Sequence, residues 1–381
     1  MQFVTIIRQV FSRKGTMDWV LLFSALTIVA FGLITMNSFT GDNLFFQKQL
    51  VSLVVALVAF FLATKVDTGM LKRTNFLVIL FSTMSTLLII LFVVGHIAHG
   101  AQSWFRVGLF AFQPGDAMKL ILIFILAKYF SRRHIEIAHF RHILVSGMYA
   151  FIPFVLILFQ PDFGSAMIIF LIWLGMILVS GVSKKHLALV FLSAALVFCV
   201  LWFGAFKPYQ KSRIMTFVHP MMDIRGTGYN SYQSTIAVGS GQILGKGVGY
   251  GTQSRLLFLP EYQTDFIFAA FAEEWGLIGV LILFGLFAVI IWRILMIAMV
   301  GATNFEMLYG MGVAIFIISH FVVNIGMTIG LLPVTGVTVP FMSYGGSHIL
   351  IEFIALGLLV SMKRSARPAH RSALKNEFLG V

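Results

Sequence analysis

The 21-residue stretch at 75–95, NFLVILFSTMSTLLIILFVVG, carries no charged side chain. Coiled as an α-helix it would be about 31 Å long, close to the thickness of the hydrocarbon core of a bilayer. Because a helix satisfies its own backbone hydrogen bonds in lipid, such a run is expected to cross a membrane. Nine further apolar runs of similar length occupy 18–37, 47–64, 115–130, 143–159, 164–181, 187–206, 266–296, 306–328 and 346–362. The sequence therefore predicts an all-α integral membrane protein with about ten transmembrane helices.

Composition supports this fold class. Of the 381 residues, 59% are hydrophobic and only 11% are charged, whereas a soluble globular protein is about 25% charged. This excludes a soluble enzyme, a disordered chain and a nucleic-acid reader. The net charge of +13 lies in short pieces between apolar runs, a pattern typical of membrane topology rather than of a nucleic-acid surface. We therefore expect no nucleic acid among the partners.

The distribution of Lys and Arg predicts the orientation. With a cytoplasmic N-terminus (1–17), the inner segments hold 18 of the 27 basic residues, five of them in a basic cytoplasmic tail at 363–381. Six of the nine on the outer side lie in one long loop at 207–264, and long translocated loops are largely exempt from the positive-inside rule. We expect a single polytopic domain over 1–381, with both termini cytoplasmic and this extracytoplasmic loop before the eighth helix.

The outer loop at 207–264 ends in the most informative stretch of the chain. Its glycine-rich part, at 239–251, allows either a phosphate cradle or simple loop flexibility, and it fits no nucleotide-binding motif. Asp265 follows the loop, at the expected outer mouth of a helix, with Thr264 as a plausible cap and Glu261 just before it. Two readings stay open for Asp265: a structural acid that suits the helix dipole, or a functional carboxylate.

Two more acids, Glu273 and Glu274, fall about 12 Å further along the same helix, where charges mark function or a paired network. On a helical wheel Glu273 lies about 80° from Asp265 and Glu274 nearly opposite. We therefore expect that Glu273 and Glu274 do not serve the same cavity.

Several cations are expected on the same side as Asp265. Asp116 and Lys119 share one face of the fourth helix, behind Pro114 in its first turn, either as an ion pair or as ligand contacts. Pro161 could likewise start a helix. An outer site with many cations and one carboxylate suits an anionic lipid such as a lipid diphosphate. The other cations are Lys48, Arg106, Lys211, Arg213, Lys246 and Arg255.

The last outer loop is rich in glycine, proline and serine and includes Ser343, Gly345 and Gly346. Such residues at membrane depth indicate either irregular backbone that lines a cavity or tight helix packing.

The chain resembles the SEDS family, whose branches are RodA (elongation), FtsW (division) and SpoVE (sporulation). Four blocks carry this resemblance: Gly100 to Pro114, Gln160-Pro161-Asp162-Phe163-Gly164, Gln233 to Glu274, and Asn324 to Ser347. Within the third block, residues 245–247 and 251–254 look like the elongation branch.

The resemblance implies a peptidoglycan glycosyltransferase of the bacterial cytoplasmic membrane that polymerises lipid II. Its implied partners are a class B penicillin-binding protein and other elongation-complex membrane proteins. The family's essential acid matches Asp265, and its Gln-Pro-Ser-Glu-x-x-Lys motif maps onto Gln113 to Lys119. This chain departs from the family at Gly115 and Asp116, at Ser103 (where the family has Arg, with Arg106 nearby) and at Lys48.

A mechanism follows as a hypothesis. A sugar hydroxyl attacks the anomeric carbon of a lipid-diphosphate donor, with Asp265 as base and Lys119, Arg213, Lys246 and Arg255 as stabilisers of the leaving diphosphate. A divalent cation, Mg²⁺ or Mn²⁺, could assist, although the sequence assigns no metal ligands. Two alternatives remain: a non-catalytic scaffold and a lipid II flippase. Because the polar residues gather at the outer face, we rank the enzyme first, the scaffold second and the flippase third.

Overall fold

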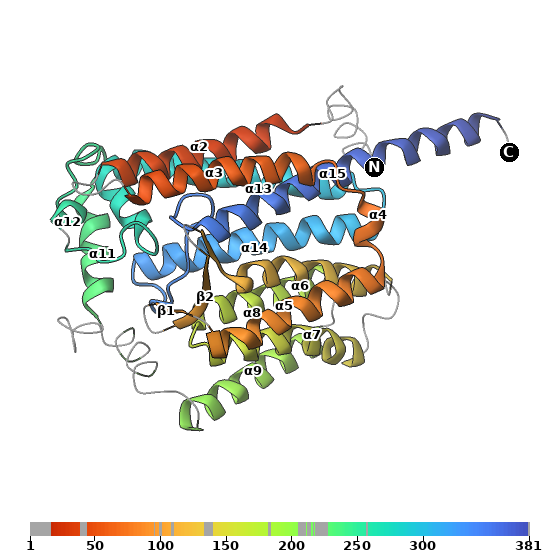
Figure 1. The fold of residues 1–381 in the computed structure, drawn as a ribbon, viewed down its shortest axis with the longest axis horizontal. Coiled ribbons are helices and arrows are strands. Elements are labelled where there is room, and N and C mark those ends of the chain that lie inside the picture. The colour runs from red at the N-terminus through yellow and green to blue at the C-terminus, as the bar shows by residue number, and fades with distance from the viewer. Residues whose placement is uncertain are drawn as a thin grey trace.

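The computed structural model describes 17–38, 44–94, 96–98, 101–107, 110–132, 140–181, 184–204, 211, 215, 217, 228–256 and 258–379. For some of these residues, including 365–379, only the backbone is described. All ten predicted apolar runs are helical (Figure 1). The corresponding helices are α2 (Trp19–Asn37), α3 (Leu44–Ala63), α5 (Thr74–Val94), α6 (Pro114–Ser131), α7 (Phe140–Phe159), α8 (Phe163–Val179), α9 (Lys184–Gly204), α13 (Ile267–Met299), α14 (Asn304–Thr328) and α15 (Gly346–Leu379).

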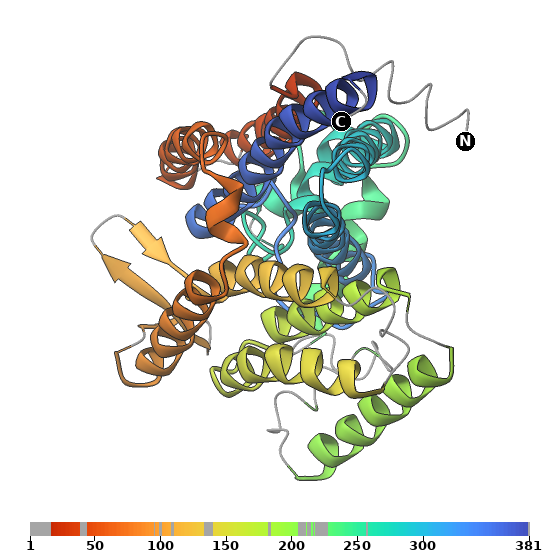
Figure 2. The same ribbon diagram turned by 90° about the vertical axis from the view of Figure 1, so that its right-hand side faces the viewer.

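Seven of the described helices are long and apolar enough to cross a membrane, and Phe163–Val179 is a shorter apolar helix. These helices form one bundle with α14 near its centre (Figures 1 and 2). The apolar window of α14 is 67% buried, whereas those of α3 and α5 are 17% buried. The last two therefore turn most of their apolar surface outward, as lipid-facing helices do. The total of ten membrane spans and the cytoplasmic location of both termini stay predictions.

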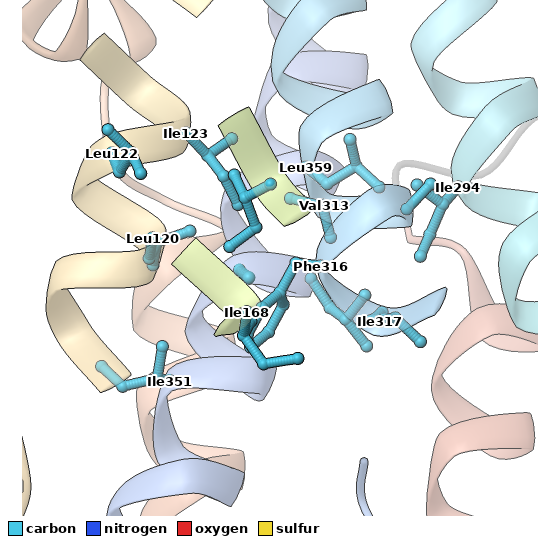
Figure 3. Packing of buried hydrophobic residues seen from close by; sticks show 14 of the residues in the cluster. Leu120, Leu122, Ile123, Ile168, Ile294, Val313, Phe316, Ile317, Ile351 and Leu359 are labelled. Carbon is cyan, nitrogen blue, oxygen red and sulfur yellow. The ribbon is translucent and has the colours of Figure 1, made fainter. Parts of the chain in front are cut away.

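The core forms where α6, α8, α13 and α15 pack around α14 (Figure 3). Ile123, Ile168, Val313 and Phe316 are buried side chains of this cluster. Close approach of α6 and α14 depends on Gly312, because a Cβ there would lie 2.4 Å from Cγ2 of Ile123.

Helix starts follow local capping chemistry. Pro114 is the first residue of α6, as predicted. Pro161 does not start a helix: α8 begins at Phe163, because the carboxylate of Asp162 accepts a hydrogen bond from the amide of Ser165 and caps that helix.

The all-α prediction describes the bundle, and the structure adds one small sheet. Three antiparallel strands, β1 (His96–Ala98), β2 (Ala101–Val107) and β3 (Phe110–Phe112), connect α5 to α6. The expected long loop is also structured in its described part, with α11 (Tyr229–Ser240) and α12 (Thr252–Arg255). The sheet, α11 and α12 lie at one end of the bundle, and the short α4 (Thr68–Leu71) lies at the other (Figure 1).

We refer to these as the α11 end and the α4 end. The first is the predicted outer side of the membrane, because it carries the loop before the eighth helix. The projecting part of α15 leaves the bundle at the α4 end (Figure 1).

Candidate active site around Asp265

Asp265 lies in a turn that precedes α13. The helix begins at Ile267 and its cap is Phe266, which makes no side-chain capping bond, so the prediction that Thr264 caps this helix is wrong. The reason is local: the amide of Phe266 donates to the carbonyl of Glu261, and the Thr264 hydroxyl donates to the Glu261 carboxylate at 3.1 Å. A closed turn therefore occupies the residues that the first helical turn was expected to use.

The backbone of this turn is fixed at three consecutive carbonyls. The carbonyl of Gln263 accepts a hydrogen bond from the amide of Tyr344 at 2.9 Å. That of Thr264 accepts from the Ser343 hydroxyl at 2.7 Å, and that of Asp265 accepts from the Asn324 amide group at 2.7 Å. Because α14 and the segment before α15 hold these carbonyls, the position of Asp265 depends on tertiary contacts from two directions.

The carboxylate of Asp265 is half-buried and faces Gly336. A Cβ at Gly336 would lie 3.3 Å from Oδ2 of Asp265, and Gly336 has a φ of +75°. The backbone conformation favours glycine, and a Cβ would crowd the Asp265 carboxylate. Burial raises the pKa of the neighbouring Tyr262 hydroxyl above its usual value, so this group stays protonated at neutral pH.

Residues 329–345, which we term the α14–α15 connector, have no regular helix and are mostly buried from 335 onward. Gln49 of α3 holds them: its amide donates to the Ser343 carbonyl and its oxygen accepts from the Gly345 amide, both at 3.1 Å. At the start of α15, a Cβ at Gly346 would lie 2.9 Å from the Ser52 hydroxyl of α3, so the two helices approach closely there. The backbone here is irregular, as expected, whereas the expectation that it lines a cavity stays a prediction. Half-buried Lys48 precedes Gln49 in α3.

Residues 241–251, which we term the glycine loop, fold against the start of α13. Glu273 accepts hydrogen bonds from Lys246 at 2.7 Å and from the amide of Thr252 at 3.0 Å, while Glu274 accepts from the amide of Gly249 at 3.0 Å. Both acids therefore contact one segment, and the expectation that they do not serve the same cavity stays a prediction. The loop wraps around the helix, so two faces that are 100° apart contact one segment.

The glycine loop also pairs with a break in α13. Gly276 has φ 63° and ψ −167°, which interrupts the helix. The amides of Lys246 and Gly247 donate to the carbonyls of Glu273 and Glu274, both at 3.0 Å. These glycines allow direct backbone contact, since a Cβ at Gly245 would lie 2.1 Å from the Glu274 carbonyl. Gly241, Gly245 and Gly251 pack closely against α13, whereas a Cβ at Gly247 or Gly249 would meet no atom closer than 3.4 Å. That the loop could hold a phosphate stays a prediction.

The predicted cations differ in what they contact. Lys246 is engaged by Glu273. Arg255, in the last turn of α12, is exposed, and neither it nor Lys48 forms a salt bridge with any residue that the structure describes. Of Arg106 only the backbone in β2 is described, and Arg213 lies outside the described residues.

Asp116 and Lys119 form a buried ion pair of 2.9 Å. A chain of polar side chains continues from it: His348 lies 3.5 Å from Asp116 and 3.0 Å from Glu352, and His320 lies 3.4 Å from Lys119. Glu352 then accepts a hydrogen bond from the amide of Phe341 in the connector at 2.9 Å. Lys119 is 2% exposed, so in this conformation it supports the connector from beneath and does not reach the surface.

The two Gln-Pro segments singled out from the sequence lie against each other. The side-chain amide of Gln113 donates to the carboxylate of Asp162 at 3.0 Å, and buried Gln160 donates to the Leu88 carbonyl at 2.8 Å. In this structure Gln160 therefore links the end of α7 to α5, and Asp162 links the start of α8 to the residue before α6.

Sequence reasoning missed Asn324, His320, His348 and Glu352 as parts of this arrangement. Asn324 opened a block that carried the family resemblance, so it could have been found there. The spacing of His348 and Glu352, four residues apart on α15, could have suggested their pair. Their links to Asp116 and Phe341, and the contact of His320 with Lys119, could not have been found, because those partners lie on other segments.

Among the described residues, no group of three or more His, Cys, Asp or Glu side chains could hold a metal ion. The described side chains near Asp265 therefore do not form a complete set of ligands for Mg²⁺ or Mn²⁺ by themselves.

Comparisons with known proteins agree with this arrangement. The cell cycle protein family of FtsW, RodA and SpoVE matches residues 12–368. Stage V sporulation protein E of Bacillus subtilis is 35% identical over 370 residues, covering 93% of this chain and 99% of that protein. Peptidoglycan glycosyltransferase MrdB of Escherichia coli K12 is 32% identical over 356 residues, covering 93% of this chain and 95% of that protein.

Two solved structures share the fold. One, from a study of how a peptidoglycan synthase complex coordinates polymerization and crosslinking, has a TM-score of 0.79 at 30% identity and covers 92% of this chain and 98% of its own. The other, the rod shape determining protein RodA of Thermus thermophilus, has a TM-score of 0.69 at 27% identity and covers 91% and 97%. With the apolar bundle and the near full-length match, this chain is a multi-pass protein of the bacterial cytoplasmic membrane and belongs to the family of FtsW, RodA and SpoVE.

Proposed function

We propose that this protein is a peptidoglycan glycosyltransferase that polymerises lipid II at the outer face of the cytoplasmic membrane. The observation that carries the proposal is the half-buried carboxylate of Asp265 on a turn whose three carbonyls are fixed by Asn324, Ser343 and Tyr344. A base must be held in place relative to its substrate, because small misplacements reduce rates strongly. The names of the relatives support the same activity.

In the proposed reaction, the 4-hydroxyl of an acceptor sugar attacks the anomeric carbon of a lipid-diphosphate-linked donor. A new glycosidic C–O bond forms while the bond from the anomeric carbon to the diphosphate oxygen breaks. The hydroxyl proton passes to the carboxylate of Asp265, and the electron pair of the broken bond leaves with the diphosphate. Cations near the leaving group stabilise the charge that develops on it.

Among the candidate stabilisers, exposed Arg255 and half-buried Lys48 are the best placed to meet a substrate. We assign Lys246 to holding the glycine loop, through Glu273, and the Asp116–Lys119 pair to holding the connector, through His348 and Glu352. Glu261 and Thr264 shape the turn itself. We derive no step through a divalent cation; one bound by the diphosphate would add charge stabilisation.

We further propose a class B penicillin-binding protein as the partner, and a role in elongation alongside other elongation-complex membrane proteins. The structural relative from a peptidoglycan synthase complex supports the partner. Overall identity does not separate the branches, because relatives from the sporulation and elongation branches match at 35% and 32% identity. The proposed elongation role therefore depends on residues 245–247 and 251–254.

The test is polymerisation of purified lipid II by the full chain co-purified with its partner, comparing wild type with Asp265→Ala. Asp67→Ala is a matched control, because Asp67 caps α4 at the opposite end of the bundle. Long glycan strands from the wild type and the control, and none from equally folded Asp265→Ala, support the proposal.

Each alternative predicts a different outcome. Strands from Asp265→Ala at the wild-type rate would leave Asp265 a structural acid. If no form makes strands, the enzyme proposal fails, and a lipid-scrambling assay then separates the flippase from the scaffold.

A further inference from the structure

A cavity of about 440 Å³ lies at the α4 end, away from Asp265. It is lined by the end of α6, the residue after α4, and the connection from α13 to α14. The volume is within the usual range for ligand sites. The lining residues are Lys72, Lys128, Ser131, Arg132, Ala302, Thr303, Asn304 and Phe305.

The charge of this cavity is unbalanced. Three of its lining residues, Lys72, Lys128 and Arg132, are cations. The buried acid next to it, Glu306, is already satisfied, because one oxygen pairs with Lys72 at 2.8 Å and the other accepts from the amide of Ala302 at 2.7 Å. Two positive charges therefore remain without a counter-charge among the described lining residues.

Two of these cations, Lys128 and Arg132, also have N–H donors available to a ligand. Lys128 donates to the carbonyl of Lys72 and to the Thr74 hydroxyl, which leaves one of the three ammonium hydrogens of Lys128. Arg132 is exposed at the end of α6 and makes no ion pair within the described part of the chain. The N-terminus of the 25-residue helix α14 also borders the cavity, through Thr303 and Asn304, and Glu306 in its first turn already offsets the helix dipole.

From the cavity, its charge and its donors, we propose that this site binds a phosphate group. The chemistry fits equally a phospholipid headgroup and a soluble phosphate compound. The position favours the lipid: α6 ends and α14 begins here, at the level where headgroups meet the ends of spanning helices. The predicted orientation places this level at the inner leaflet. The proposal does not depend on the activity at the α11 end.

The experiment measures binding by the full chain in neutral detergent, by native mass spectrometry and thermal shift. The probes are phosphatidylglycerol, phosphatidylcholine, inorganic phosphate and pyrophosphate, at matched ionic strength. Arg132→Gln removes one exposed cation of the cavity, and Arg132→Lys keeps the charge. Arg141→Gln is the matched control, because Arg141 is an exposed cation in the first turn of α7 that does not line the cavity.

We expect phosphatidylglycerol to bind more tightly than phosphatidylcholine, with affinity about five-fold weaker in Arg132→Gln and unchanged in Arg141→Gln and Arg132→Lys. The same pattern with inorganic phosphate or pyrophosphate, but not with lipid, supports a soluble phosphate ligand. Equal binding by wild type and Arg132→Gln, or equal weakening in Arg141→Gln, overturns the proposal. Thermal stability without probe confirms that each variant is folded.

Discussion

At the scale of single residues, exposure separates the acids of this protein. Asp116, Glu273, Glu274 and Glu352 are buried and contact partners within the bundle. Asp265 is half-buried, and its backbone carbonyl accepts a hydrogen bond from the side-chain amide of Asn324. A carboxylate that is held in place and only half-buried suits proton transfer from a substrate better than one that is fully buried.

Gly336 tests the placement of Asp265. In Gly336→Ala the new Cβ would meet Oδ2 of Asp265 at 3.3 Å, on a backbone with φ +75°. We expect polymerisation to fall roughly 10- to 100-fold, with partner binding unchanged. Gly239→Ala is the control, since a Cβ there meets nothing within 4 Å. An activity of Gly336→Ala equal to that of the control would contradict the proposed placement.

Asp18 predicts a pH dependence of stability. Burial raises its pKa, but hydrogen bonds from Arg293 and Lys363 lower it more, so the net shift is downward. A carboxyl whose pKa is lower in the folded state contributes stability that is present at neutral pH and is lost as the pH falls through the acid range, below about 4. We expect Asp18→Asn to lower the Tm at pH 7 and the difference from wild type to shrink on acidification. A difference that grows on acidification would contradict this assignment.

At the scale of elements, the sequence predicts where helices lie better than where they break. Apolar runs of bilayer length give nine of the helices within a few residues, because only a helix satisfies the backbone hydrogen bonds of a single segment in lipid. The exception is α15, which starts as predicted but continues through the expected tail to Leu379. The break at Gly276 and the path of the α14–α15 connector depend on partners that are distant in sequence, such as Gln242 and Gln49. Hydrophobic periodicity contains no information on such pairings.

The break in α13 has a direct test. Gly276→Ala places a Cβ 2.2 Å from the amide nitrogen of Gly245, in a backbone conformation that is nearly exclusive to glycine. We expect the free energy of unfolding to fall by about 1–3 kcal/mol or more, which would be measured as a lower Tm in detergent. Gly285→Ala on the same helix, where a Cβ meets nothing within 4 Å, is expected to be neutral. Equal Tm values for the two variants would show that the break is not needed.

At the scale of the whole molecule, the two ends of the bundle differ in what they hold. The α11 end carries Asp265, the glycine loop and the connector, and the α4 end carries the basic cavity. The resemblance located Asp265 from sequence. The Asp116–Lys119 ion pair is one of the two interpretations of their spacing on one helix. The contact of Lys246 with Glu273 could not be predicted, because it depends on how the glycine loop folds against α13.

The orientation of the bundle is open to labelling. In a Cys199→Ala background, which removes the chain's one cysteine, we expect Tyr250→Cys to react with an impermeant maleimide in intact spheroplasts. Arg364→Cys, at the α4 end, is expected to react only after permeabilisation. Both side chains are exposed, so access to the reagent decides the result. The reverse pattern would invert the predicted topology.

The most direct test of the central claim is the single-turnover rate of lipid II polymerisation by Asp265→Asn with its partner. The amide keeps the shape of the carboxylate but cannot accept the hydroxyl proton as a base. The account predicts a loss of about 10²- to 10⁴-fold with the fold and partner binding intact. A rate within a few-fold of wild type would contradict the role of Asp265 as the base.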